Sequence, residues 1–331
     1  MPVLVTGASG FLGGRLAQVL ADRGEQVTIL ARANSDLRHL AGLPNLRVVR
    51  GSLTESAALL QAVRDASHIF HCAAVSTDWA STNLYFESNA RGTEALLAAA
   101  RQAPRLERFL HVSTTDVYGY PATPCDETSP LKDVGLPYNR TKILAEQAVW
   151  RAAHEHGLPV TIVRPATIYG PRGKAFVTDI AKLLNSGQMA HVGGGRATGG
   201  FLYVDNAVEG MIAASRSRAA QGEAYNLADG TGATWKEYVA ALAGGLGCRL
   251  PWIDLPYSAA MAIAYANEVP YRCLKGFRGR PMLTRHAVYL LGRDQEFPAN
   301  KARADFCFAS RVPLIEGVAR SVAWLKSVES I

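Results

Sequence analysis

The chain opens with a short apolar run, Val3-Leu-Val5, that leads into the glycine-spaced segment Gly7-Ala-Ser-Gly10-Phe-Leu-Gly13. Gly7 permits a tight turn, Gly10 lets an anion approach the backbone, and Gly13 allows close packing of helix on strand. A strand, a glycine loop and a helix in this order are typical of dinucleotide binding, because the free N–H groups at the helix N-terminus attract a pyrophosphate. We therefore expect the cofactor contacts of this loop to come from Gly7, Ser9, Gly10, Phe11, Leu12 and Gly13.

Up to about residue 163, short apolar runs alternate with longer amphipathic segments, which is the pattern of βαβ units. The expected strands are Val3–Val5, Val27–Leu30, Leu46–Val49, His68–His71, Phe109–Val112 and Val160–Val163, with helices beginning near Leu12, Ser56, Asn89, Tyr138 and Phe176. Six such strands predict an α/β fold with a Rossmann-type, doubly wound parallel sheet. We place the dinucleotide-binding domain at residues 1–170 and a smaller, mainly substrate-binding region, interleaved with the sheet, at residues 171–331.

The composition narrows the class of protein. The chain has 331 residues, 48% of them hydrophobic, and can bury a large core. Its net charge is +7, but the basic residues are scattered, so no nucleic-acid partner is expected. The five cysteines lie far apart without Cys-x-x-Cys spacing, which indicates neither a disulfide framework nor a metal site. No apolar stretch reaches membrane-spanning length and no leader precedes the first strand, so we expect a cytoplasmic protein.

The end of the second strand decides between the two nicotinamide cofactors, because a carboxylate there would bind a ribose 2′-hydroxyl and repel a 2′-phosphate. This strand ends Ile29-Leu-Ala-Arg32 without a carboxylate, and Asn34, Ser35 and Arg38 follow closely. Such a group suits a phosphate, so we predict NADP as the cofactor, with NAD as the alternative. Arg32 could equally be a loop arginine that faces solvent.

Tyr138 and Lys142 stand four residues apart in the segment Leu-Pro-Tyr-Asn-Arg-Thr-Lys. On a helix they share one face, so the ammonium group can lower the pKa of the phenol and prepare it for proton transfer. The same spacing also arises where a half-buried tyrosine has a solvated lysine as neighbour. The hydroxyl cluster Ser113-Thr-Thr115, at the end of the fifth expected strand, supplies the partners that proton transfer requires.

The glycine loop, the hydroxyl cluster and the Tyr-Lys pair together resemble an extended short-chain dehydrogenase/reductase of the NAD-dependent epimerase/dehydratase superfamily. Further landmarks of that family follow in order: His71-Cys-Ala-Ala, Asn89-Ala-Arg-Gly-Thr, Val117-Tyr-Gly, Arg164-Pro-Ala-Thr-Ile-Tyr-Gly-Pro and Tyr203-Val-Asp-Asn. The resemblance covers essentially the whole chain. It implies that Thr114 holds the substrate oxygen, that Tyr138 exchanges the proton, and that Lys142 binds the nicotinamide ribose.

The resemblance also implies cofactor contacts beyond the glycine loop. These fall on Arg32, Ser52, Leu53, Ala73, Ala74, Ser113, Tyr138, Lys142, Pro165 and Thr167. Relatives carry Gly-Asp-Leu where this chain has Gly51-Ser-Leu53, so Ser52 offers the adenine no charge. Sugar-nucleotide dehydratases carry an Asp-Glu pair at Thr115 and Asp116, and with Asp116 alone that elimination lacks one acid/base group.

The segment from Pro256 to Leu325 is apolar and similar to the 3β-hydroxysteroid dehydrogenase and 2-alkyl-3-ketoacid reductase branch of the family. The implied function is an NAD(P)-dependent oxidoreductase that interconverts a secondary alcohol and a ketone on a hydrophobic substrate, steroid-like or 3-keto acyl. Substrate contacts are expected from Ser76, Trp79, Thr115 and Asp116, with Trp79 an exposed tryptophan beside the cleft.

Two other functions stay open at this point. A nucleotide-sugar 4-epimerase would use the same triad to oxidise a hydroxyl transiently, and a dinucleotide-sensing regulator would bind the cofactor without chemistry. The helices that begin near Asn89 and Tyr138 are apolar enough to form a homodimer, although covering the sheet would explain the same composition.

Overall fold

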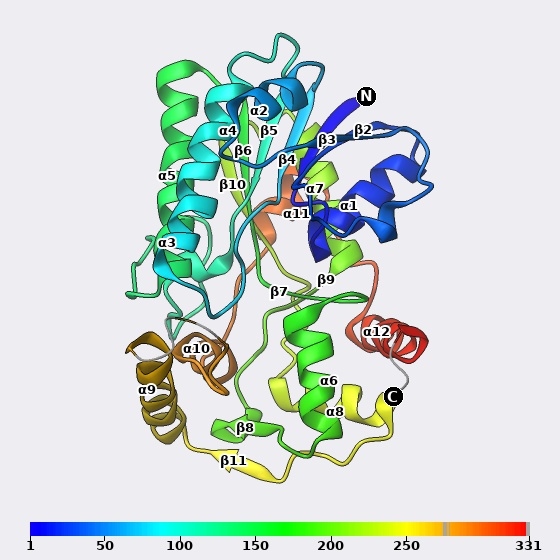
Figure 1. The fold of residues 1–331 in the computed structure, drawn as a ribbon. Coiled ribbons are helices and arrows are strands. Elements are labelled where there is room, and N and C mark those ends of the chain that lie inside the picture. The colour runs from blue at the N-terminus through cyan, green and yellow to red at the C-terminus, as the bar shows by residue number, and fades with distance from the viewer. Residues whose placement is uncertain (274–276, 278, 329–331) are drawn as a thin grey trace.

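The computed structural model describes residues 1–273, 277 and 279–328, and a seven-stranded parallel sheet forms its centre (Figure 1). The strand order is β10-β6-β5-β4-β1-β2-β3. The strands are β1 (Pro2–Thr6), β2 (Gln26–Ala31), β3 (Leu46–Arg50), β4 (His68–His71), β5 (Arg108–Val112), β6 (Val160–Pro165) and β10 (Glu223–Leu227). The predicted α/β fold with a Rossmann-type parallel sheet is therefore confirmed.

The seventh strand, β10, is not among the six strands expected from the sequence. Its residues, Glu-Ala-Tyr-Asn-Leu, form neither an apolar run nor an alternating pattern, so their periodicity gives no strand signal. The strand forms because it pairs with β6 in parallel register, with Ala224 opposite Ile162. Polar Asn226 is tolerated there since its side chain bonds the Tyr118 hydroxyl at 2.8 Å and the Cys125 carbonyl at 3.0 Å.

Helices cover both faces of the sheet, as a parallel sheet requires. One face is covered by α2 (Ser56–Val63), α4 (Gly92–Ala100) and α5 (Pro137–His156), and the other by α1 (Phe11–Asp22), α7 (Val204–Arg216) and α11 (Asn300–Phe306). Neighbouring strand residues alternate between the two cores: Ile69 packs under the first set and Phe70 under the second.

The apolar residues of α4 and α5 are used on the sheet, in the core that contains Leu96 and Val149. Their outer surface carries the ion pair between Arg151 and Glu94, at 3.1 Å. Covering the sheet therefore accounts for the apolar composition of both helices. A homodimer through this face stays a prediction.

The helix expected near Asn89 begins earlier and has three parts. It starts with α3 (Thr82–Tyr85), continues as a π-helical segment (Phe86–Arg91) and ends as α4. Asn89, buried in the π-helical segment, accepts a hydrogen bond from the Val75 backbone N–H at 2.7 Å and donates one to its carbonyl at 3.1 Å. These bonds anchor the loop that follows β4 at the carboxyl edge of the sheet.

The remaining elements gather at the carboxyl edge of the sheet, in the lower half of Figure 1. They are the strand pairs β7 (Thr167–Tyr169) with β9 (Phe201–Tyr203) and β8 (Ala190–Val192) with β11 (Ile253–Leu255), and the helices α6 (Asp179–Asn185), α8 (Trp235–Leu246), α9 (Tyr257–Cys273), α10 (Arg285–Gly292) and α12 (Leu314–Val328). The domain division at residue 170 stays a prediction, since β10, α7 and α11 of the later part belong to the layers of the large sheet.

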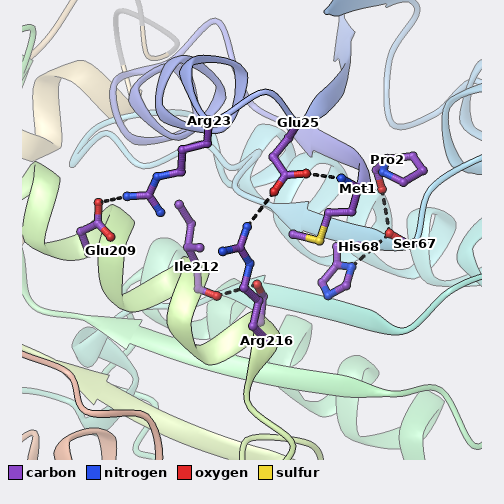
Figure 2. A network of polar contacts seen from close by, with 10 residues as sticks. Met1, Pro2, Arg23, Glu25, Ser67, His68, Glu209, Ile212 and Arg216 are labelled. Carbon is purple, nitrogen blue, oxygen red and sulfur yellow. Dashed lines mark hydrogen bonds and ion pairs between the residues drawn. The ribbon is translucent and has the colours of Figure 1, made fainter.

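Polar contacts fix the first βα unit against α7 (Figure 2). Glu25, which follows α1, pairs with the Met1 ammonium group and, at 2.7 Å, with Arg216 at the end of α7. Arg23 pairs with Glu209 of α7. Surface ion pairs contribute little stability each, so their main consequence is the orientation of α1, whose N-terminus carries the glycine loop.

Within the part of the chain that the structure describes, no helix combines the length and apolarity needed to cross a membrane. The same residues contain no group of three or more His, Cys, Asp or Glu side chains placed to hold a metal ion.

Candidate functional site

The glycine loop has the shape that a pyrophosphate requires. Gly7 has a φ of +74°, and a Cβ there would lie 2.7 Å from the backbone nitrogen of Ala73. A Cβ on Gly13 would lie 2.6 Å from the Gly7 carbonyl oxygen. Gly10 caps α1 without a side-chain bond, so backbone N–H groups of the first turn remain available to an anion. The chain therefore fits a dinucleotide at this position.

Two basic residues that the sequence analysis missed pack against this loop. His39 Nε2 donates a hydrogen bond to the Ala8 carbonyl at 3.1 Å, and Arg172 reaches the same place from the loop after β7. Burial, assisted by the charge of Arg172, lowers the pKa of His39, so the imidazole is neutral at pH 7. Neither residue belongs to a sequence motif, and only the packing around α1 brings them to the glycine loop.

The region expected to hold a 2′-phosphate contains three arginines and one acid. Arg32 is exposed after β2, and Arg50 of β3 donates to its carbonyl oxygen at 3.0 Å. Arg38 is engaged by Asp36, an acid not weighed in the sequence analysis, at 2.7 Å. The hydrogen bonds from Arg38 hold the pKa of Asp36 well below its usual value, so Asp36 is ionised and offsets one of the positive charges.

The predicted adenine contacts lie at the end of β3. The Ser52 hydroxyl donates to Glu55 at 2.8 Å, so its proton already has an acceptor inside the protein. Leu53 packs against Gly92, where an added Cβ would lie 2.8 Å from its side chain. The side chain of Leu53 is placed by packing and that of Ser52 by hydrogen bonds inside the protein, and the adenine contacts of both residues stay a prediction.

The structure brings the three residues of the expected triad together. The helix α5 begins at Pro137, so Tyr138 and Lys142 lie in its first two turns on one face. Thr114 caps the 3₁₀ turn Thr115–Tyr118, and its hydroxyl accepts from the Asp116 backbone N–H at 3.2 Å. The Thr114 side chain also lowers the pKa of the Tyr138 phenol, against the larger opposing effect of burial. These contacts place a hydroxyl donor beside the candidate acid.

The prediction that Lys142 lowers the pKa of the Tyr138 phenol is wrong. Burial and the Asp116 carboxylate raise the pKa of Tyr138, against a smaller opposing effect of Thr114. The ammonium group of Lys142 is buried and donates to the Val112 carbonyl at 2.6 Å. Burial lowers the pKa of Lys142 to about 8, opposed by Glu146 and Cys72. The phenol is thus strongly held in its protonated form.

The other expected cofactor residues surround the carboxyl ends of β4, β5 and β6. Ala73 and Ala74 are half-buried, whereas Pro165 and Thr167 are buried. The Ser113 hydroxyl is buried and has no hydrogen-bond partner among the described residues. A buried hydroxyl without a partner is costly, so its position fits the cofactor-side role expected of Ser113.

A cavity lies next to Tyr138, between the sheet edge and the helices α9 and α10. Figure 1 shows these two helices below α3. It is lined by Asp78, Trp79, Ala80, Thr82, Tyr85, Leu136, Pro137, Tyr138, Glu268, Arg272, Phe277 and His286. Trp79 is half-buried rather than exposed as expected, with its ring edge-on to Tyr271 at 6.3 Å. The other expected substrate residues are placed differently: Ser76 is exposed outside the lining, and Thr115 and Asp116 are buried behind it.

The acidic groups of the cavity wall form ion pairs with arginines in the wall or beside it. Asp78 pairs with Arg280 at 2.9 Å and accepts from the Thr284 hydroxyl at 2.7 Å. Glu268 pairs with Arg285 at 2.8 Å and with Arg272 at 3.2 Å. Because these charges satisfy each other, the aromatic and aliphatic side chains remain to contact a substrate.

His286 of α10 is the main residue that the sequence analysis missed. Its Nε2 donates to Asp116 at 2.9 Å, and its ring stacks on that of Tyr138 with centroids 5.5 Å apart and planes 23° apart. Burial opposes a charge on the imidazole, but Asp116, assisted by Asp78 and Glu268, raises the pKa of His286 above its usual value. The only signal in the sequence was its place after the helix start Leu283-Thr-Arg285.

Comparison with known proteins supports the predicted family. The model of the NAD dependent epimerase/dehydratase family matches residues 3–228. A 4-hydroxy-2-methyl-3-oxo-4-farnesyl-3,4-dihydroquinoline-1-oxide ketoreductase of Stigmatella aurantiaca is 34% identical over 96% of this chain and 95% of its own length. A 2-alkyl-3-oxoalkanoate reductase of Stenotrophomonas maltophilia (strain K279a) is 31% identical over 97% of this chain and 98% of its own. The expected resemblance is confirmed.

Among solved structures, a UDP-glucuronic acid 4-epimerase from Bacillus cereus in complex with NAD superimposes with a TM-score of 0.80. It is 22% identical and covers 99% of each chain. At this identity the likeness shows the fold alone.

Proposed function

The chain belongs to the NAD dependent epimerase/dehydratase family, and we propose that it interconverts a secondary alcohol and a ketone on a hydrophobic substrate, steroid-like or 3-keto acyl. It is an NAD(P)-dependent enzyme of the extended short-chain dehydrogenase/reductase type. The observation that carries the proposal is the position of Tyr138, which lies near Thr114 and lines a cavity together with the aromatic side chains Trp79, Tyr85 and Phe277.

The named activities of the two relatives support a ketone substrate, since both are reductases of oxo compounds. The apolar side chains Trp79, Tyr85 and Leu136 would contact the hydrocarbon part of such a substrate. Dehydration of a nucleotide sugar is disfavoured, because Thr115 stands where that mechanism needs a second carboxylate.

In the proposed reduction, the Thr114 hydroxyl holds the ketone oxygen and the Tyr138 phenol donates the proton that this oxygen gains. A bound nicotinamide would supply the hydride for the carbonyl carbon. Lys142 would turn from the Val112 carbonyl to the nicotinamide ribose when the cofactor binds.

We propose NADP as the preferred cofactor. The Arg50 guanidinium donates to the backbone carbonyl of Arg32 where β2 ends, and a 2′-phosphate on the adenine ribose would lie there. Asp36 does not remove this preference, because it is already paired with Arg38.

The test is turnover. The purified protein with NADPH should oxidise the cofactor in the presence of 3-keto acyl esters or 3-ketosteroids, seen as a loss of absorbance at the nicotinamide band. Tyr138→Phe should abolish this loss, whereas Tyr289→Phe, which removes a hydroxyl from the same region, should retain it. Turnover that survives Tyr138→Phe would refute the proposal. Interconversion of UDP-sugars without net cofactor change would favour the epimerase.

A further inference from the structure

We propose that His286 is a positioning residue for the acid/base phenol: its ion pair with Asp116 neutralises the carboxylate beside Tyr138 and so sets the pH range in which Tyr138 exchanges its proton. This inference rests on the proposed function, because it assigns Tyr138 the role of acid/base.

The geometry joins three elements that are far apart in the sequence. Asp116 lies in the 3₁₀ turn after β5, Tyr138 in the first turn of α5, and His286 in the first turn of α10. His286 contacts both partners at once, with its Nε2 on Asp116 at 2.9 Å and its ring parallel to that of Tyr138. Both side chains of the ion pair are more than nine-tenths buried, so solvent screens their effect on the phenol only weakly.

The sign of the effect follows from charge. An ionised Asp116 disfavours a tyrosinate nearby, and it is among the causes that raise the pKa of Tyr138. A protonated His286 places a positive charge against the same carboxylate and reduces its field at the phenol. Loss of the His286 charge should therefore make Tyr138 a weaker acid, and loss of the Asp116 charge should make it a stronger one.

Other titratable or charged groups around His286 come from every element packed on it. They are Tyr120 after the 3₁₀ turn, Asp78 in the loop after β4, Glu268 of α9, Arg280 and Arg285 beside the start of α10, and Tyr289 of α10. Asp78 and Glu268 have their own arginine partners. Asp116 is thus the partner that matters most.

The experiment measures the pKa of Tyr138 directly. Protein labelled with ¹³C at the tyrosine ring carbon that bears the hydroxyl is titrated with bound NADP, and the Tyr138 resonance is assigned by its absence in Tyr138→Phe. His286→Gln should raise this pKa by on the order of one unit, and Asp116→Asn should lower it by a similar amount. The double variant should lie between the two single variants. The pH–rate profile for alcohol oxidation should shift in the same directions.

Two further variants separate charge from packing. His286→Phe keeps a ring on Tyr138 without a charge and should raise the pKa of Tyr138 as His286→Gln does. Tyr289→Phe, on the same helix, should leave it unchanged. A purely structural role for His286 would give either unfolded protein or pKa shifts of the same sign in His286→Gln and Asp116→Asn. The inference is overturned if the folded variants leave the pKa of Tyr138 equal to that of the wild type, or if both shift it in the same direction. If the wild-type protein reduces no ketone, the proposed function fails, whereas the Tyr138 titration still tests the role inferred for His286.

Discussion

Glu146 accepts two hydrogen bonds from Arg164, at 2.9 and 2.6 Å, between α5 and the sheet. Both side chains are almost fully buried, and Arg164 also donates to the Tyr118 hydroxyl at 2.9 Å. Glu146 lies one turn beyond Lys142, so this bidentate pair ties the helix that carries Tyr138 to β6. The same carboxylate favours the charged form of Lys142.

Glu146→Gln should destabilise the protein strongly, because it leaves the Arg164 guanidinium buried without a counter-charge. We expect the free energy of unfolding to fall by about 3–5 kcal/mol, measured by urea denaturation. Glu94→Gln, which removes the surface pair with Arg151, should cost no more than about 1 kcal/mol. Equal losses in the two variants would contradict the importance of the buried pair.

Arg32→Ala should weaken NADPH binding while NADH binding stays nearly constant. A charge-assisted hydrogen bond to the 2′-phosphate contributes about 1.5–3 kcal/mol, which is a tenfold or larger change in affinity. The measurement is the KM for each cofactor with the same ketone. Arg38→Ala serves as the control, since Asp36 already engages Arg38 and a smaller effect is expected. A parallel loss of NADPH and NADH affinity would argue against the 2′-phosphate site.

Gly13→Ala should impair cofactor binding, because its Cβ would stand 2.6 Å from the Gly7 carbonyl oxygen and displace the loop. Gly244→Ala provides the matched control: it lies in α8, and an added Cβ there meets nothing within 4 Å. That change should leave binding intact and stabilise the protein by about 0.4–1 kcal/mol. NADPH fluorescence titration and thermal unfolding measure the two effects. Normal NADPH affinity in Gly13→Ala would remove the loop from the cofactor site.

Acidification should destabilise the protein below about pH 6.5. Burial, together with the charge of Lys142, lowers the pKa of His71 to about 3 and that of His111 well below its usual value. The unfolded chain therefore binds more protons in this range, and stability falls by up to about 1.4 kcal/mol per pH unit for each histidine. His286 has a raised pKa and acts oppositely: its contribution is present below about pH 6.5 and is lost as the pH rises through its folded value.

Urea denaturation between pH 5 and 8 measures this dependence. His111→Leu should flatten this pH dependence, because it removes one of the two histidines with a lowered pKa. The change breaks no hydrogen bond of the His111 ring, since neither of its nitrogens has a partner among the described residues. A slope that persists unaltered in His111→Leu would assign the dependence to other groups.

The sequence alone determined the Rossmann-type sheet and the place of the glycine loop, because these depend on local patterns. Apolar runs form β1 to β6, and glycine spacing forms the turn between β1 and α1. It also supplied Thr114, Tyr138 and Lys142, since the motifs that carry them have fixed spacing. The strand β10 escaped it, because only pairing with β6 makes that segment a strand.

The tertiary structure decided what surrounds the phenol. His286 lies 170 residues after Asp116, and no local pattern relates the two. The packing of α10 over the sheet edge brings them within 2.9 Å and excludes the water that would screen them. For the same reason the pKa of Tyr138 moved upward where the spacing to Lys142 had suggested a fall. Spacing along a helix fixes which residues share a face, whereas burial and contacts from distant segments fix their charge.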